Sequence, residues 1–397
     1  MLFSNYLLFI YIVSFVVIYT MVRSFIKSVL LRNGLIAIAN VLLLLNLVKE
    51  HTIIVLAILS LIVYVLGRLL QTKNSKALLS FSLSLIIVLF IIRNYSAVQS
   101  FLSHSFLHAP ILSVQKLGLS YILFRFVHWL IESFKQKIQK PNFLTFINYI
   151  LFFPSILAGP IDTYNNFQYW IGKSNASYSR SLFFAGISRI FIGALKTLGL
   201  VPLIIHYATD YSVFPVSIPP LMALFMSLIC YSFYIYLDFS GYSDIAIGTA
   251  YLIGIKTPEN FNNPYRSQNL SEFWKRWHMT FSSFLQLYVF KPFIQLFNTF
   301  LHSKNRLLIT ILSYLATFVI CGLWHGATIN FVYWGLWHGF GLSINKIWLI
   351  KMKPHVAFSG SKTYQFLSIV LTFLYISMGW LFFHYSSAQL VNIFKLF

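Results

Sequence analysis

Three histidines stand in aromatic, apolar stretches where a buried imidazole would stay neutral. They are His278 in FWKRWHMTFS, His325 in CGLWHGATIN and His338 in WGLWHGFGLSIN. A neutral imidazole can take a proton from a hydroxyl, so each of them is a candidate general base. The alternative for each is a structural histidine that is hydrogen-bonded in the core.

The spacing of His325 and His338 limits how they could act together. They are 13 residues apart, which is about 220° around an ideal helix. They share no helix face unless the Gly-Ala-Thr between them ends the helix. Cys321 lies one turn before His325, so a Cys–His nucleophile pair is geometrically open, with an inert buried cysteine as the alternative.

The sequence predicts no metal site. His104 and His108 have the i,i+4 spacing of a metal-binding pair, but no third ligand lies near them, so interfacial histidines are expected. Cys230 and Cys321 both lie in apolar stretches, and they form neither a disulfide framework nor a metal spacing.

Polar residues concentrate between Tyr231 and Tyr288. Asp238 directly follows an apolar run there, and a charge at membrane depth costs at least about 2.5–3.5 kcal/mol and usually marks function. The alternative is a helix-end carboxylate paired with a nearby Arg or Lys. Gly241 and Gly248 are expected to permit close helix packing, and a turn-rich loop follows at residues 258–264.

The elements that position these residues must be membrane helices. Of the 397 residues, 58% are hydrophobic and only 9% are charged, whereas soluble proteins carry about 25% charged residues. This excludes a soluble enzyme, a disordered chain and a fibre. Apolar runs of helical length recur without alternating polarity, so we predict an all-α polytopic membrane protein rather than a β-barrel.

We expect about ten or eleven membrane elements. Several apolar runs are shorter than the roughly 20 residues that cross a bilayer, which predicts re-entrant or slanted helices. The runs are Leu2–Val22, Gly34–Val48, Thr52–Leu66, Leu78–Ile92, Leu117–Phe134, Leu144–Ala158, Phe183–His206, Pro219–Tyr236, Ile309–Trp324, Phe331–Leu342 and Phe366–Phe383.

Basic residues predict the orientation. The 29 basic and 8 acidic residues give a net charge of +21, which suits anionic lipid of a cytoplasmic membrane and not nucleic acid. Basic clusters at residues 23–32 and 68–76 follow the first and third runs, so these loops are expected in the cytoplasm and the N-terminus outside. The first run lacks the flanks of a cleaved signal and is expected to be an uncleaved span.

Several segments together resemble the membrane-bound O-acyltransferase (MBOAT) family, over Leu117 to Lys353. They are LGLSYILFR, FFPSILAGPID, YLDFSGYSDIAIG, GIKTPENFNNPY, EFWKRWHMTFSSF, GLWHGA and HGFGLSINKIW. The nearest likeness is to the bacterial branch, and within it to teichoic-acid D-alanylation before alginate O-acetylation. The resemblance implies a ring of tilted and re-entrant helices around a central funnel. It also implies one membrane domain over residues 1–397, with peripheral helices at 1–95, a catalytic core at 117–353 and a C-terminal helix at 354–397.

The same resemblance implies roles for individual residues. His325 matches the catalytic histidine of the family and His278 its second conserved polar position, while His338 matches a non-catalytic position. We expect His325 to activate an acceptor hydroxyl, and His278 to orient or polarise the acyl carbonyl. A further set is expected to bind substrate or shape the funnel: Asp238, Asn260, Asn263, Tyr265, Trp274 and Trp324.

The implied reaction moves an acyl group, D-alanyl before acetyl, from a cytoplasmic thioester to a hydroxyl of a cell-envelope polymer or of an extracytoplasmic relay protein. No bound cofactor is expected. The donor would be the phosphopantetheine thioester of an acidic carrier protein, or acyl-CoA. Four basic residues are expected to dock it: Lys256, Arg266, Lys275 and Arg276. Membrane lipids are the remaining expected partners.

The chain departs from the family pattern at residues 285–288, which read Leu-Gln-Leu-Tyr. Both bacterial branches usually carry Arg-Asp before Tyr or Phe there, so a charge anchor is missing and donor docking is expected to differ. Three alternatives stay open: O-acetylation of an exopolysaccharide, an inactive scaffold, and a transporter. Intramembrane Asp and His residues also relay protons, although no inverted repeat is present.

Overall fold

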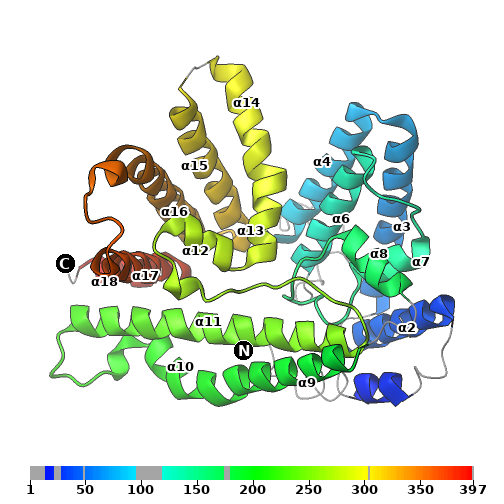
Figure 1. The fold of residues 1–397 in the computed structure, drawn as a ribbon, viewed down its shortest axis with the longest axis horizontal. Helices are drawn as coiled ribbons and strands as arrows, with labels where there is room; N and C mark the ends of the chain where they lie inside the picture. Colours follow the sequence, from blue (N-terminus) through cyan, green and yellow to red (C-terminus); the bar gives the residue numbers. More distant parts are fainter. Residues whose placement is uncertain are drawn as a thin grey trace. The chain divides into compact units, whose positions relative to one another are not determined.

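The protein is described by a computed structural model that covers residues 14–21, 28–47, 50–94, 119–173, 179–302 and 305–395. Every regular element in these ranges is a helix, so the all-α prediction is confirmed. Figure 1 shows the principal helices. Their bounds are α2 (Val29–Leu47), α3 (Glu50–Lys73), α4 (Lys76–Asn94), α6 (Leu119–Phe134), α7 (Phe143–Ile150), α8 (Tyr164–Gly172), α9 (Arg180–Ala194), α10 (Val201–Thr209), α11 (Pro220–Leu252), α12 (Leu270–Arg276), α13 (Met279–Leu285), α14 (Lys291–Leu301), α15 (Arg306–His325), α16 (Ile329–Ile347), α17 (Lys362–His384) and α18 (Ser387–Phe394).

The protein is a multi-pass membrane protein. Within the described residues, six helical stretches are long and apolar enough to cross a bilayer, and α4 adds a shorter apolar helix. Several of the other elements are helices of seven to nine residues, such as α7, α8 and α12. Most of the expected first span, Leu2–Val22, lies outside the described residues. The six stretches are Val29–Leu47, Thr52–Lys73, Arg180–Thr209, Pro220–Leu252, Arg306–His325 and Lys362–His384.

The chain forms two compact units. The first comprises residues 1–195 and 241–258, and the second comprises residues 196–240 and 259–397. Helix α11 therefore contributes its first part to the second unit and its last part to the first. The predicted single domain and its three subdivisions stay predictions.

Glycines bring α9 and α11 together in the first unit. A Cβ on Gly186 would lie 2.9 Å from the Gly248 carbonyl oxygen, and one on Gly193 would lie 2.5 Å from the Gly241 carbonyl oxygen. A Cβ on Gly248 would in turn lie 2.6 Å from the Gly186 carbonyl oxygen, so the packing role predicted for Gly248 is confirmed, while that of Gly241 stays a prediction.

One predicted helix of the first unit is shorter than expected. The apolar run Leu144–Ala158 is helical only as far as Ile150, and turns follow. Pro154 cannot continue a helix, and the buried guanidinium of Arg125 stabilises the non-helical backbone. Its Nη1 donates to the carbonyls of Tyr149 and Ile150, and its Nη2 donates to Ser155.

The sequence suggested that Asp238 lies at a helix end. In the structure it lies within a helix. Helix α11 runs for 33 residues, about 50 Å, and continues through Asp238 for 14 more residues. The polar residues after Asp238 do not end the helix because their side chains are buried against neighbours. Ser240, Ser243 and Asp244 are all buried, and Asp244 forms an ion pair with Arg189 at 2.6 Å.

Within the described ranges, each π-helical turn is followed two residues later by a proline. The turns end at Leu200, Phe290 and Met352, and prolines stand two residues later at positions 202, 292 and 354. Proline removes a backbone N–H and its ring clashes with the carbonyl four residues earlier, so a wider turn lets the helix continue. This explains why Phe183–His206 reads as one run and forms two helices joined by a π-turn.

Candidate active site

His278 is held by Asn260 in the second unit. The amide N–H of Met279 donates to the Asn260 carbonyl at 2.8 Å, and that of Asn262 donates to the Arg276 carbonyl at 2.9 Å. These two hydrogen bonds tie the loop at residues 258–264, which we call the Asn/Pro loop, to the segment between α12 and α13. They also set the Asn260 Oδ1 atom 2.8 Å from the His278 Nδ1 atom.

The hydrogen bonds of Asn260 define which nitrogen of His278 carries the proton. Oδ1 of Asn260 also accepts from the Thr280 hydroxyl at 2.9 Å. An amide oxygen can only accept, so Nδ1 of His278 donates to it. The Nε2 atom then carries the lone pair, and His278 in this tautomer is a hydrogen-bond acceptor on that side.

The backbone of His278 is in the left-handed region, with φ of 42°. Residues other than glycine seldom adopt this conformation, which costs energy and recurs at functional sites. The imidazole stacks on Phe281 at 5.0 Å and meets the edge of Phe239 at 4.8 Å. Burial, together with neighbouring His325, lowers the pKa of His278 to about 3, so its ring is neutral at pH 7.

His325 is the last residue of α15, where the chain reverses direction. Gly326–Thr328 separates α15 from α16. A Cβ on Gly322 would collide with the Phe331 carbonyl, and one on Gly335 with the Phe318 carbonyl. These two glycines therefore permit the close antiparallel approach of α15 and α16, which lie side by side in Figure 1.

The imidazole of His325 is surrounded by aromatic rings. Its centroid lies 4.5 Å from Trp324, 4.9 Å from Trp334 and 5.0 Å from Phe383. The side chain is half-buried, and neither ring nitrogen is hydrogen-bonded to another described residue. Such a ring can accept a hydrogen bond from a substrate hydroxyl while aromatic neighbours limit access of water.

The helix break also brings His338 close to this group. The 220° separation on a single helix does not apply, because His325 and His338 lie on antiparallel neighbours. The indole of Trp334 contacts both imidazoles, at 4.9 Å and 4.8 Å. His338 is fully buried, and no described protein group bonds either ring nitrogen. Trp334 and Thr280 were not among the expected site residues, although Trp334 lies in the WGLWHG segment.

Several expected funnel residues surround these histidines. The ring of Trp274 meets His338 edge-on at 5.0 Å, and Trp324 contacts Phe281 at 4.6 Å. The hydroxyl of Tyr265 donates to the Ser232 carbonyl at 2.6 Å. Asn263 is exposed in the left-handed region with φ of 44° and has a structural reason to be asparagine.

Asp238 is half-buried on α11, and its carboxylate has neither a hydrogen bond nor a salt bridge within the described part of the chain. The expected Arg or Lys partner is therefore absent there. Cys321 is buried one turn before His325. No group of three metal-ligating side chains occurs among the described residues, and His104 and His108 lie outside them.

The sequence pattern of the MBOAT, membrane-bound O-acyltransferase family matches residues 42–388. Teichoic acid D-alanyltransferase of Bacillus subtilis is 31% identical over 299 residues, which are 72% of this chain and 72% of that protein. The chain belongs to the membrane-bound O-acyltransferase family. The resemblance drawn from its motifs is thereby confirmed, and the matched range includes all three Trp-His segments and the Asn/Pro loop.

Two further members of the family acetylate, by their names. Peptidoglycan O-acetyltransferase of Helicobacter pylori is 31% identical over 246 residues, 61% of this chain and 44% of that protein. Probable alginate O-acetylase AlgI of Pseudomonas syringae pv. tomato is 29% identical over 276 residues, 67% of this chain and 48% of that protein. The matches span about half the length of these two relatives. As a member of this family the chain is an O-acyltransferase, and the transporter alternative is wrong.

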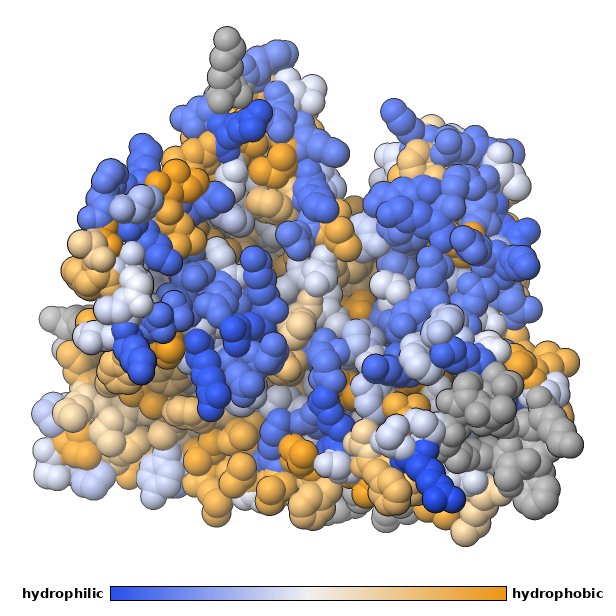
Figure 2. Space-filling model, viewed as in Figure 1, coloured by the Kyte–Doolittle hydropathy of each residue, from blue (hydrophilic) through white to orange (hydrophobic). Residues whose placement is uncertain are grey.

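The basic residues expected to dock the donor differ in their surroundings. Arg266 and Lys275 of this MBOAT protein are exposed and have no acidic partner among the described residues. Arg276 instead forms an ion pair with Glu272 at 2.6 Å, one helical turn away. Figure 2 shows hydrophilic residues over α12, which carries two of these cations. Lys256 is exposed and belongs to the first unit.

The segment that departs from the family pattern spans the end of α13 and a π-turn. Leu285 is buried, whereas Gln286 and Leu287 are exposed. The π-turn at residues 286–290 carries no charged side chain.

Proposed function

We propose that this protein transfers an activated acyl group, D-alanyl before acetyl, from a cytoplasmic thioester to a hydroxyl. The acceptor is a cell-envelope polymer or the hydroxyl of an extracytoplasmic relay protein. The observation that carries this proposal is the His325 imidazole, which sits in an aromatic wall with both ring nitrogens available to a substrate. The similarity to a teichoic acid D-alanyltransferase over 72% of both chains supports the D-alanyl group. The similarity to acetyltransferases supports acetyl as the second candidate, with an exopolysaccharide as its acceptor.

In the proposed step, the acceptor hydroxyl attacks the carbonyl carbon of the thioester. His325 takes the hydroxyl proton as the oxygen–carbon bond forms, and the carbon–sulfur bond then breaks. The proton passes from the imidazolium to the departing thiolate, so the histidine ends neutral. Excluding water matters because water would compete for the activated acyl group.

His278 acts in this proposal as a positioning group. Its Nδ1 proton is committed to Asn260, and its Nε2 atom accepts. An accepting nitrogen orients a hydroxyl or an imidazole N–H but cannot polarise a carbonyl oxygen, so of its two expected roles the orienting one is supported. Asp238, Asn263, Tyr265, Trp274 and Trp324 shape the funnel around the donor.

The donor side is proposed to face the cytoplasm, in the cytoplasmic membrane, with the N-terminus outside. Arg266 and Lys275 are the cations that an acidic carrier protein or coenzyme A would meet, since neither is neutralised within the described chain. No cofactor is bound permanently. The missing Arg-Asp pair removes one charge contact, so the remaining cations carry more of the docking.

The test uses purified protein in proteoliposomes with defined donors. Radiolabelled D-alanyl carrier, acetyl carrier and acetyl-CoA are supplied outside, and teichoic acid or alginate is supplied as acceptor. We expect label to reach teichoic acid from the D-alanyl carrier, above protein-free vesicles. Transfer from acetyl donors alone would replace D-alanyl by acetyl in the proposal, and no transfer to any acceptor would overturn it.

A further inference from the structure

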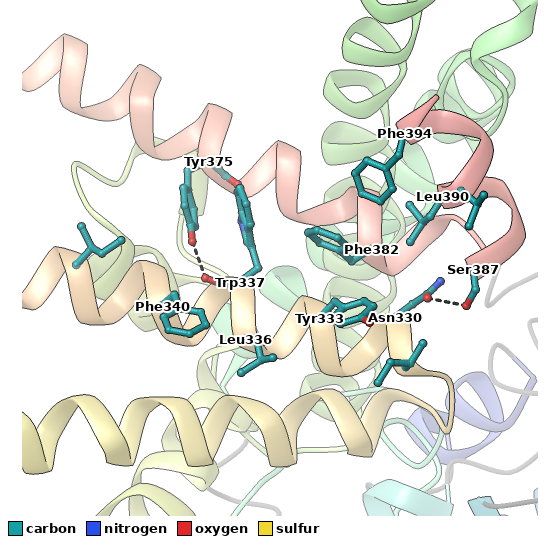
Figure 3. A pocket seen from close by; sticks show the side chains of 13 residues that line it. Asn330, Tyr333, Leu336, Trp337, Phe340, Tyr375, Phe382, Ser387, Leu390 and Phe394 are labelled. Atoms are coloured by element: carbon teal, nitrogen blue, oxygen red, sulfur yellow. Dashed lines mark hydrogen bonds between the residues drawn. The ribbon is translucent and has the colours of Figure 1, made fainter. Parts of the chain in front are cut away.

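A groove runs along α16, with walls and floor from α17 and α18 (Figure 3). Its volume is about 770 Å³. The lining from α16 follows helical spacing, so one face of this helix forms the length of the groove. We call it the α16 groove. Its apolar lining residues are Ile329, Tyr333, Leu336, Trp337, Phe340, Ile344, Tyr375, Phe382, Leu390, Val391 and Phe394.

Four polar residues of the α16 groove, Asn330, Trp337, Tyr375 and Ser387, already have protein hydrogen-bond partners. Ser387 donates to Asn330 at 2.8 Å, and the Asn330 amide donates to the Tyr385 carbonyl at 2.7 Å. The Tyr375 hydroxyl donates to the Trp337 carbonyl, and the Trp337 indole donates back to the Tyr375 carbonyl at 3.1 Å. Apart from the Tyr333 hydroxyl, the groove therefore offers a ligand an apolar surface.

The groove end of α16 is followed by an aromatic residue and a cation. Trp348 comes one turn after Ile344, and Lys351 lies in the π-helical turn Trp348–Met352 that follows α16. Trp348 is 41% exposed while its indole donates to Tyr364. An apolar stripe followed by tryptophan and then lysine is the order of groups found where hydrocarbon meets the headgroup layer.

Lysines gather at this end and lack protein counter-ions. Lys346, Lys351 and Lys353 have no acidic partner among the described residues. A ligand that complements both features needs an anionic head and a long apolar chain. The α16 face from Ile329 to Ile344 is about 22 Å long, and one leaflet of hydrocarbon is about 15 Å thick. A complete acyl chain fits along it.

We propose that the α16 groove binds one anionic phospholipid. One acyl chain lies along Phe340, Trp337 and Tyr333, and the phosphate contacts Lys351 with Lys346 and Lys353 beside it. The charge complementarity of this end distinguishes the ligand from zwitterionic bulk lipid. The proposal is independent of the acyl donor and acceptor.

Tryptophan quenching tests the proposal in the full-length protein in nanodiscs. Phospholipids brominated on the acyl chain quench nearby indoles, and the quenching lost in Trp337→Phe isolates the signal of the groove. We expect brominated phosphatidylglycerol to quench this signal at a mole fraction about tenfold lower than brominated phosphatidylcholine. Glycerol phosphate carries the headgroup chemistry without acyl chains. An excess of it should not reverse the quenching if the groove binds the acyl chain as well as the headgroup.

Two sets of variants test separately the contacts to the lipid headgroup and those to its acyl chain. Lys346→Gln/Lys351→Gln/Lys353→Gln should abolish the preference for phosphatidylglycerol, whereas the control Lys73→Gln/Lys76→Gln/Lys291→Gln should keep it. Leu336→Phe/Val391→Phe, which narrows the groove, should reduce quenching by both lipids. Equal quenching by the two lipids in wild type, or a preference that survives the first triple change, would overturn the proposal. Absence of any quenching of Trp337 would also overturn it and would leave the groove to a partner's apolar helix.

Discussion

At the scale of single residues, the bond between Asn260 and His278 decides which nitrogen can meet a substrate. Its loss would let the imidazole rotate and exchange tautomers. We therefore expect Asn260→Ala to lower kcat, by less than the roughly 10²–10⁴-fold effect expected for loss of the base His325, and with a smaller effect on KM, since it acts through a positioning group. Steady-state transfer assays measure both constants. Thr280→Val removes the second bond to Asn260 and keeps the bond of Asn260 to His278, so it should cost less; equal losses in the two variants would contradict this account.

The burial of His278 also predicts a dependence of stability on pH. Its pKa is about 3 in the folded protein, against 6.5 for an unperturbed imidazole. Below pH 6.5 the unfolded chain binds a proton that the folded chain does not, so stability falls as the pH is lowered toward 3. At pH 5 this difference in proton binding lowers the free energy of unfolding by about 2 kcal/mol.

His278→Gln should remove this contribution. The loss of unfolding free energy between pH 7 and pH 5 should shrink by about 2 kcal/mol relative to wild type, measured by denaturant unfolding in detergent. His302→Gln changes an exposed histidine and should keep the wild-type dependence. The same dependence in wild type and His278→Gln would show that His278 protonates without unfolding.

At the scale of elements, the α15–α16 hairpin positions His325, and its spacing depends on glycine. Gly322→Ala would drive a methyl group into the Phe331 carbonyl, and backbone cannot yield as a side chain can. We expect a loss of about 1–3 kcal/mol in unfolding free energy and a lower kcat, because His325 would shift. Gly34→Ala is the matched control: it is helical, no atom lies within 4 Å of its added Cβ, and it should be neutral or stabilising. Gly322→Ala with wild-type stability would argue against this packing.

Element boundaries show where sequence reasoning stops. The close packing at Gly248 follows from residue size alone and was predictable. The end of α15 at His325 was left open, because a Gly-Ala-Thr segment can lie within a helix or end it. The length of α11 was misjudged because Asp238 and the serines after it look like a helix end. Their burial depends on neighbours distant in the sequence, which periodicity does not report.

The sequence likewise predicted only some features of the candidate site. Composition and motifs identified His278, His325 and the Asn/Pro loop. The bond from Asn260 to His278, the contact of Trp334 with two imidazoles and the Arg276–Glu272 pair all depend on how loops fold back. Of these, only the i,i+4 spacing of Glu272 and Arg276 is a local signal.

At the scale of the whole molecule, the net charge of +21 makes an anionic partner attractive at long range. If Arg266 and Lys275 dock an acidic carrier, Arg266→Glu/Lys275→Glu should raise the apparent KM for the carrier with kcat nearly intact at saturation. The effect should weaken at high salt, because exposed charges more than about 8 Å apart are screened at physiological ionic strength.

The control for this experiment is Lys291→Glu/Lys362→Glu, which changes the net charge equally at other exposed lysines. Carrier titrations at low and high salt compare both variants with wild type. Arg276 is left unchanged because it is paired with Glu272. If the two double variants give identical titrations, carrier docking does not involve this face.

The most direct test of the central claim is single-turnover acyl transfer by wild type and His325→Ala in proteoliposomes, with D-alanyl carrier and acceptor both saturating. His302→Ala serves as the exposed control. If His325 takes the proton from the acceptor hydroxyl, its loss should slow transfer by about 10²–10⁴-fold while the protein still inserts and binds carrier. Transfer at the wild-type rate in His325→Ala would contradict the account and would assign the proton transfer to another group of the protein.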